Sequence, residues 1–143
     1  MHRIKLNYLK WIFGQLNGNI IWIKGNHDTH ITEHWLRELT EVSKIIEIKD
    51  YDEIFFADSD QKIGYRRLVL FHYPILEFNG KFHGAYHIYG HSHQIVHPIK
   101  NAYSVCACLT EYSPVNFEWI KTTILNHNER LDRLGQSGLQ SAN

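Results

Sequence analysis

The sequence predicts an α+β or α/β fold, because short apolar runs typical of strands alternate with segments of helical periodicity. Residues 6–16 carry apolar side chains at helical spacing and end at Asn17-Gly18. Residues 19–24 form a short apolar run between glycines, which is typical of a buried strand. Thr32 is a suitable N-cap for a second helix. The inner face expected for that helix consists of Trp35, Leu36, Leu39 and Val42.

The second half of the chain is expected to contain most of the strands. The pattern predicts strands at residues 44–48, 53–57, 65–72, 85–89 and 102–109, and a short helix at residues 116–125. Beyond Asn126 the composition becomes polar, so we expect a flexible tail at residues 127–143. Because no internal repeat or linker is visible, residues 1–126 are interpreted as one domain.

Charge and composition exclude several classes of function. Lysine plus arginine and aspartate plus glutamate number 15 each among 143 residues, which argues against a general nucleic-acid or membrane-surface binder. The apolar runs are too short for a transmembrane helix, and the N-terminus lacks the apolar segment of a signal peptide. Cys106 and Cys108 are poorly spaced for a disulfide with each other. We therefore expect free thiols packed as small apolar residues, in a cytoplasmic protein.

Histidine is the unusual component, with 11 residues in the chain. The first polar segment that follows a predicted strand is Gly25-Asn26-His27-Asp28. Asn26 offers an amide oxygen suited to a divalent cation, and His27 offers an imidazole that can donate a proton. Asp28 can orient that imidazole. A turn with a helix cap is the simpler explanation of this segment taken alone.

Two further segments follow predicted strands. His72 ends an apolar strand, where a side chain is well placed for a site at the edge of the sheet. In Gly90-His91-Ser92-His93, the two histidines share one face of an extended segment, so both can reach one metal cluster. A single histidine at a strand end is usually a hydrogen-bonded structural residue. The ordered set of three segments is what favours a metal site built from Asn26, His72, His91 and His93.

The three segments resemble the calcineurin-like metallophosphoesterases. That family has five ordered motifs: Asp-x-His, Gly-Asp, Gly-Asn-His-Asp/Glu, an isolated histidine and Gly-His-x-His. Residues 25–28 match the third motif, His72 the fourth and residues 90–93 the fifth. The stretch from His72 to His93 and the segment Tyr112-Ser113-Pro114-Val115 are also similar to a small subgroup common in bacteria and their phages. The resemblance covers residues 5–125 and implies two packed β-sheets flanked by helices.

The resemblance implies a role for each matching residue. Asn26, His72 and His91 would hold the second metal of a two-metal site, and His93 would hold the first. His27 would protonate the leaving group, with Asp28 as its orienting partner. The implied reaction is hydrolysis of a phosphomonoester or phosphodiester in a small phosphorylated substrate. Two divalent ions are implied, with manganese expected and iron, zinc and nickel left open.

His83 and His87 lie in the subgroup-like stretch before Gly90. Two interpretations stay open for them: contact with the substrate, and ordinary packing or polar support.

The first two motifs of the family have no match before Gly25. The 24 residues there contain no aspartate, and His2, the one histidine among them, has no Asp-x-His around it. We therefore expect a chain that lacks two ligands of the first metal and the carboxylate that bridges both metals. The family domain would then be truncated and would lack its N-terminal strand or strands. Its bare sheet edge would favour self-association.

Three hypotheses of function follow. The first is a metal-dependent phosphoesterase whose N-terminal motifs are absent from this chain. The second is an inactive truncated remnant that acts as a binding or interaction module. The third is a histidine-rich zinc module that needs His91 and His93 but not Asn26.

Overall fold

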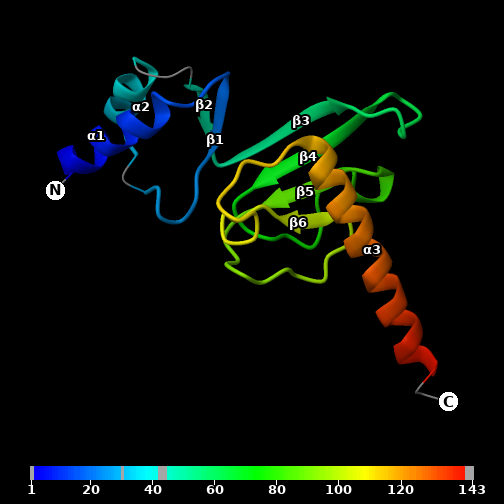
Figure 1. The fold of residues 1–143 in the computed structure, drawn as a ribbon. Helices are drawn as coiled ribbons and strands as arrows, with labels where there is room; N and C mark the ends of the chain where they lie inside the picture. Colours follow the sequence, from blue (N-terminus) through cyan, green and yellow to red (C-terminus); the bar gives the residue numbers. More distant parts are fainter. Residues whose placement is uncertain (1, 30, 42–44, 141–143) are drawn as a thin grey trace. The chain divides into compact units, whose positions relative to one another are not determined.

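The computed structural model describes residues 2–29, 31–41 and 45–140 (Figure 1). Its contacts divide the chain into two compact units, Met1–Asp50 and Tyr51–Asn143. The first contains a two-stranded sheet and the second a four-stranded sheet, and helices occur in both. This mixture confirms the α+β class. Packing of two sheets against each other stays a prediction from the family resemblance.

The first unit contains two helices and a short parallel sheet. Its elements are α1 (His2–Phe13), β1 (Ile20–Ile23), α2 (Glu33–Thr40) and β2 (Ile45–Lys49). β1 pairs with β2 in parallel (Figure 1). The predicted cap is confirmed, because the Thr32 hydroxyl accepts a hydrogen bond from the Trp35 amide.

A small apolar core holds the first unit together. Leu6, Trp35 and Leu39 are buried, and the partly buried Leu36 and Trp22 pack against them. This confirms the predicted inner face of α2 except for Val42, which lies outside the described residues. The expected strands at residues 19–24 and 44–48 correspond to β1 and β2.

The sheet of the second unit has the order β3-β4-β5-β6. The strands are β3 (Tyr51–Ala57), β4 (Tyr65–Phe71), β5 (Tyr86–Tyr89) and β6 (Ala102–Ser104). β3 and β4 are antiparallel, whereas β4, β5 and β6 are parallel to one another. A short 3₁₀ turn, η1 (Lys81–His83), precedes β5. Since parallel strands end at the same edge, the residues that follow β4, β5 and β6 come together there.

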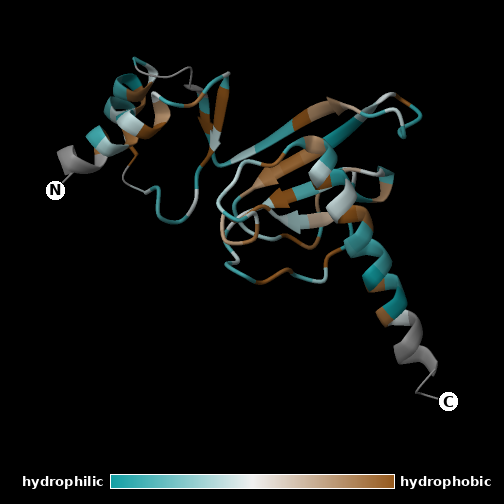
Figure 2. Cartoon of the chain, in the orientation of Figure 1, coloured by the Kyte–Doolittle hydropathy of each residue, from teal (hydrophilic) through white to brown (hydrophobic). Residues whose placement is uncertain are grey.

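Helix α3 (Phe117–Gln140) packs on one face of this sheet. Its fully buried Ile124 belongs to one cluster with Leu68, Tyr86 and Ile88. A second cluster contains Tyr89, Ile99 and Ala102. Because Tyr89 points to the opposite side of β5 from Tyr86 and Ile88, this cluster lies on the other face of the sheet. In Figure 2 apolar residues gather in the strands and in the first turns of α3, while the next turns of α3, up to those drawn in grey, are mainly hydrophilic.

A buried ionic network joins the turn after β3 to α3. The Asp58 carboxylate is fully buried and bonds the Arg66 guanidinium and the Lys121 ammonium. Arg66 also donates to the Gly84 carbonyl oxygen and lies over the Tyr86 ring. Burial raises the pKa of Asp58, but hydrogen bonds from Lys121 and Arg66 outweigh it and bring that pKa to about 2.

The two largest differences between predicted and observed boundaries lie in the last strand and the last helix. The strand expected at residues 102–109 ends at Ser104, and the chain then forms consecutive turns. The helix expected to end at Leu125 continues to Gln140, so residues 127–140 of the expected tail are helical. The extension contains a contact that composition does not reveal: the Asn128 side chain bonds the amide and the side chain of Asn101. None of the helices within the described ranges combines the length and apolarity needed to cross a bilayer.

Candidate functional site

The predicted site residues are divided between the two units. Asn26, His27 and Asp28 lie in the first unit, and His72, His91 and His93 lie in the second. Each group is described within its own unit.

The segment Gly25–Asp28 is a tight turn after β1. The Gly25 amide donates to the Asp28 carboxylate at 2.7 Å, and the Asp28 amide donates to the Gly25 carbonyl oxygen at 3.0 Å. Asp28 therefore closes the turn, and no hydrogen bond within the described residues joins it to the His27 ring. Asn26 and His27 are exposed at the tip of the turn. The turn thus presents an amide and an imidazole to solvent, as a ligand and a proton donor require.

A small aromatic cavity of about 220 Å³ adjoins this turn. Tyr8, Trp22 and Trp35 line it together with His27 and Asp28. Its size and its mainly apolar lining suit an aromatic ring or a short apolar group.

His72 and His91 face each other in the second unit. Nε2 of His72 lies 3.2 Å from Nδ1 of His91. Two nitrogens on one metal ion lie roughly 3.0–3.4 Å apart, since each metal–nitrogen bond is about 2.0–2.1 Å long. The pair therefore fits a shared divalent ion, as the resemblance implies for these two residues.

The ends of β4 and β5 create this pair. The Gly90 amide donates to the His72 carbonyl oxygen at 3.0 Å, which ties the two strand ends together. A Cβ atom on Gly90 would lie 3.4 Å from Nδ1 of His72, in van der Waals contact with that ring, so a larger side chain there would reach the ring itself. The Tyr73 ring packs against both imidazoles, with ring centroids 4.9 Å from His72 and 4.6 Å from His91.

The loop after β5 places His93 beside the two cysteines and not beside His72. Ser92 is buried and its hydroxyl hydrogen-bonds Nε2 of His97 at 2.8 Å, while His91 and His93 are exposed. Nδ1 of His93 lies 3.5 Å from Sγ of Cys106 and 3.5 Å from Sγ of Cys108. The ligand atoms of these three residues all lie within 4.8 Å of one another.

The two cysteines were not predicted as functional residues. They are free thiols, as expected. The expectation that they pack as small apolar residues is wrong, because both are half-exposed and their sulfur atoms face His93. The available signal was the presence of two closely spaced cysteines in a chain rich in histidine, since both residue types are common zinc ligands. The pKa of the Cys108 thiol is lowered, first by its hydrogen bond with His93 and second by that with Tyr112.

His87 and His83 have different surroundings. His87 is fully buried, with Nδ1 3.1 Å from the Val69 carbonyl oxygen and Nε2 3.3 Å from the Ile75 amide. This arrangement favours the packing interpretation of His87 over contact with a substrate. Burial lowers the pKa of its imidazole, so the neutral form is favoured. His83 lies in η1 and is exposed.

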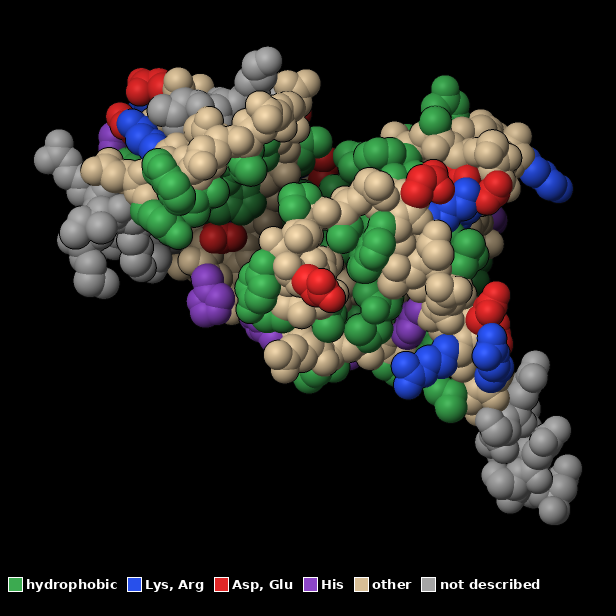
Figure 3. Space-filling view, in the orientation of Figure 1, with side chains coloured by type: hydrophobic (Ala, Val, Ile, Leu, Met, Phe, Trp, Pro, Cys, Tyr) green, Lys and Arg blue, Asp and Glu red, His purple; other side chains and the backbone are tan. Residues whose placement is uncertain are grey.

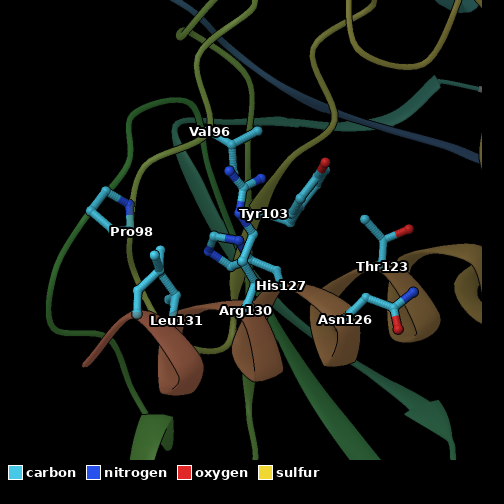
Figure 4. Close-up of a pocket in the computed structure, with 9 residues that line it drawn as sticks. Val96, Pro98, Tyr103, Thr123, Asn126, His127, Arg130 and Leu131 are labelled. Carbon is cyan, nitrogen blue, oxygen red and sulfur yellow. The ribbon is translucent and has the colours of Figure 1, made fainter. Parts of the chain in front are cut away.

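A larger cavity of about 450 Å³ lies between α3 and the loop before β6. Figure 4 shows His127, Arg130 and Leu131 of α3 around it, with Val96, Pro98 and Tyr103 on the other side. Nε2 of His127 is buried without a hydrogen-bond partner among the described residues. None of the residues that line this cavity belongs to the three motif segments.

Charged side chains of both signs lie side by side on the surface. On the face drawn in Figure 3, lysine and arginine side chains neighbour aspartate and glutamate. This matches the balanced composition. The absence of general nucleic-acid binding stays a prediction.

Comparison with protein-family models, with curated proteins and with solved structures finds no match to this chain. The motifs and the geometry of each unit therefore carry the functional argument.

Proposed function

We propose that this chain is a metal-dependent phosphoesterase that hydrolyses a phosphomonoester or phosphodiester. The observation that carries the proposal is the His72–His91 pair, whose ring nitrogens are 3.2 Å apart. Two strand-end histidines from the fourth and fifth family motifs converge at a spacing that suits one divalent ion. The Gly-Asn-His-Asp turn supplies the third family motif.

The proposal gives each residue a chemical task. His72 and His91 would hold a divalent ion with their imidazole nitrogens. When bound, divalent ions would neutralise phosphoryl charge and supply a nucleophilic hydroxide. His27 would donate a proton to the leaving oxygen. The thiols beside His93 give it a donor set unlike the first-metal site that the resemblance implies, so the proposal depends on His72 and His91.

The test is hydrolysis of bis-p-nitrophenyl phosphate and p-nitrophenyl phosphate by the purified chain with added manganese. His27→Ala and His91→Ala should each lower the rate, by roughly 100-fold or more. His34→Ala is the matched control, because His34 is an exposed histidine of α2 outside the three motifs. Its rate should equal that of the unchanged chain.

Two outcomes separate the hypotheses. Activity that survives in both His27→Ala and His91→Ala would come from another site or a contaminant and would refute the proposal. A folded chain with no activity at any manganese concentration would favour the alternative, a non-catalytic binding or interaction module.

A further inference from the structure

We propose that His93, Cys106 and Cys108 form a zinc site that is separate from the His72–His91 pair. The ligand atoms are Nδ1 of His93 and the two sulfur atoms. This inference does not rest on the phosphoesterase proposal, because it uses other donor atoms and predicts binding rather than catalysis.

The two nitrogen–sulfur distances match those of tetrahedral zinc. Zinc–sulfur bonds are about 2.3 Å and zinc–nitrogen bonds about 2.0–2.1 Å, so a nitrogen and a sulfur on one zinc lie about 3.6 Å apart. Each thiol lies 3.5 Å from Nδ1 of His93. The three residues therefore need little movement to bind one ion. Three protein ligands also leave a fourth position for water.

Hydrogen bonds hold the two loops that carry these donors. The Ser104 hydroxyl donates to the Gly90 carbonyl oxygen at 3.1 Å and accepts from the Cys106 amide at 3.3 Å. It thereby joins the end of β5, where the histidine loop begins, to the start of the cysteine loop. Within the cysteine loop, the Leu109 amide donates to the Cys106 carbonyl oxygen and the Tyr112 amide to that of Ala107, each at 2.8 Å. Such support lowers the cost of ordering the ligands.

The donor chemistry selects the metal. Binding releases the thiol protons of Cys106 and Cys108 to solvent, and the two thiolates then neutralise the charge of a divalent ion. Soft thiolate ligands favour zinc over manganese, the ion expected for nitrogen and oxygen ligands in the proposed phosphoesterase. Tyr112 lies near this site, with its hydroxyl oxygen 3.8 Å from Sγ of Cys108.

Cobalt(II) is the spectroscopic probe for the site. The metal-free chain, kept reduced with a phosphine, should develop the near-ultraviolet sulfur-to-cobalt absorption as one cobalt ion binds the two thiols, and zinc should displace that cobalt. Cys106→Ser, Cys108→Ser and His93→Ala should each weaken zinc binding by roughly 100-fold or more. His91→Ala should keep the sulfur-to-cobalt absorption, because His91 belongs to the separate His72–His91 pair. Zinc should also protect two thiols from alkylation.

Each result decides the proposal. Loss of the absorption in the two cysteine variants and its retention in His91→Ala would support it. Circular dichroism of the metal-free variants should equal that of the unchanged chain, so that lost binding is not lost folding. Unchanged zinc affinity in Cys106→Ser and Cys108→Ser would overturn the proposal. Equal loss in His91→Ala and His93→Ala would overturn it in favour of one histidine-only site.

Discussion

Replacing Asp58 with asparagine should destabilise the second unit by about 3 kcal/mol. The change keeps the shape of the side chain and removes its charge. Arg66 is buried, with its side chain only 7% exposed, so it would lose its carboxylate partner without gaining access to water. Lys121 would keep its contact with Asp60, which limits the loss on that side.

The magnitude follows from the burial of the pair. Removing one partner of a buried ion pair costs about 3–5 kcal/mol, and the remaining bond from Arg66 to the Gly84 carbonyl oxygen places Asp58→Asn at the lower end. The matched control is Asp60→Asn, because Asp60 contacts the same lysine but its side chain is 61% exposed. It should cost less than about 1 kcal/mol.

The pH dependence gives a second measure of the same network. The pKa of Asp58 falls from 3.8 to about 2 on folding, so this carboxylate stabilises the fold above about pH 4. That contribution, about 1–2 kcal/mol after allowance for solvent screening, should disappear as the pH falls from about 4 to 2. Asp58→Asn should lack this loss.

Hydrogen exchange followed by mass spectrometry is the assay of choice, because peptides from β4 and α3 report opening of the second unit alone. The unchanged chain, Asp58→Asn and Asp60→Asn would be compared at pH 7. Equal protection of β4 in Asp58→Asn and Asp60→Asn would refute the argument that the buried carboxylate stabilises this unit.

Three further predictions concern the sheet and α3. Gly90→Val should lower manganese-dependent hydrolysis more than it lowers stability, because the added side chain would press on the His72 ring; an unchanged rate in folded Gly90→Val would contradict this. The free energy of unfolding should decrease as the pH falls below about 6.5, because burial lowers the pKa of His87 and the unfolded chain takes up that proton more readily. Urea titrations at several pH values measure this, and His87→Gln should flatten the slope. Asn128→Ala should leave two partly buried groups of Asn101 without that partner and cost about 1 kcal/mol, with faster exchange in the turns of α3 around residue 128. Glu129→Ala is the exposed control and should cost less than about 0.5 kcal/mol.

Sequence patterns predicted the elements that local chemistry determines. The Thr32 cap, the inner face of α2 and the strands around Trp22 and Val69 follow from periodicity and turn residues within a few positions. Long-range contacts determine the features that were missed. In the part of α3 beyond Leu125, Asn128 bonds Asn101, 27 residues earlier in the chain.

In the candidate site, too, some contacts were predicted from local sequence and others depend on long-range contacts. The convergence of His72 and His91 was predicted, because each follows a strand in a recognisable motif. The approach of the cysteines to His93 was not, since it depends on β6 ending at Ser104 and on the turns that follow. The buried position of His87 also depends on the partners of β5, which its own neighbours in sequence do not reveal.

The parallel pairing of β5 with β6 has a consequence for folding. β3 and β4 pair as neighbours in the chain across a short turn, whereas β5 returns to β4 across residues 72–85 and β6 returns to β5 across residues 90–101. Non-local pairing of this kind forms late, because the entropy of closing the loop is lost before the contacts are gained. Cys106 and Cys108 follow β6, so they stay apart from His93 until that last strand docks. During refolding these thiols are exposed to oxidation for longer than in the finished fold, and a reducing buffer should raise the yield of native chain.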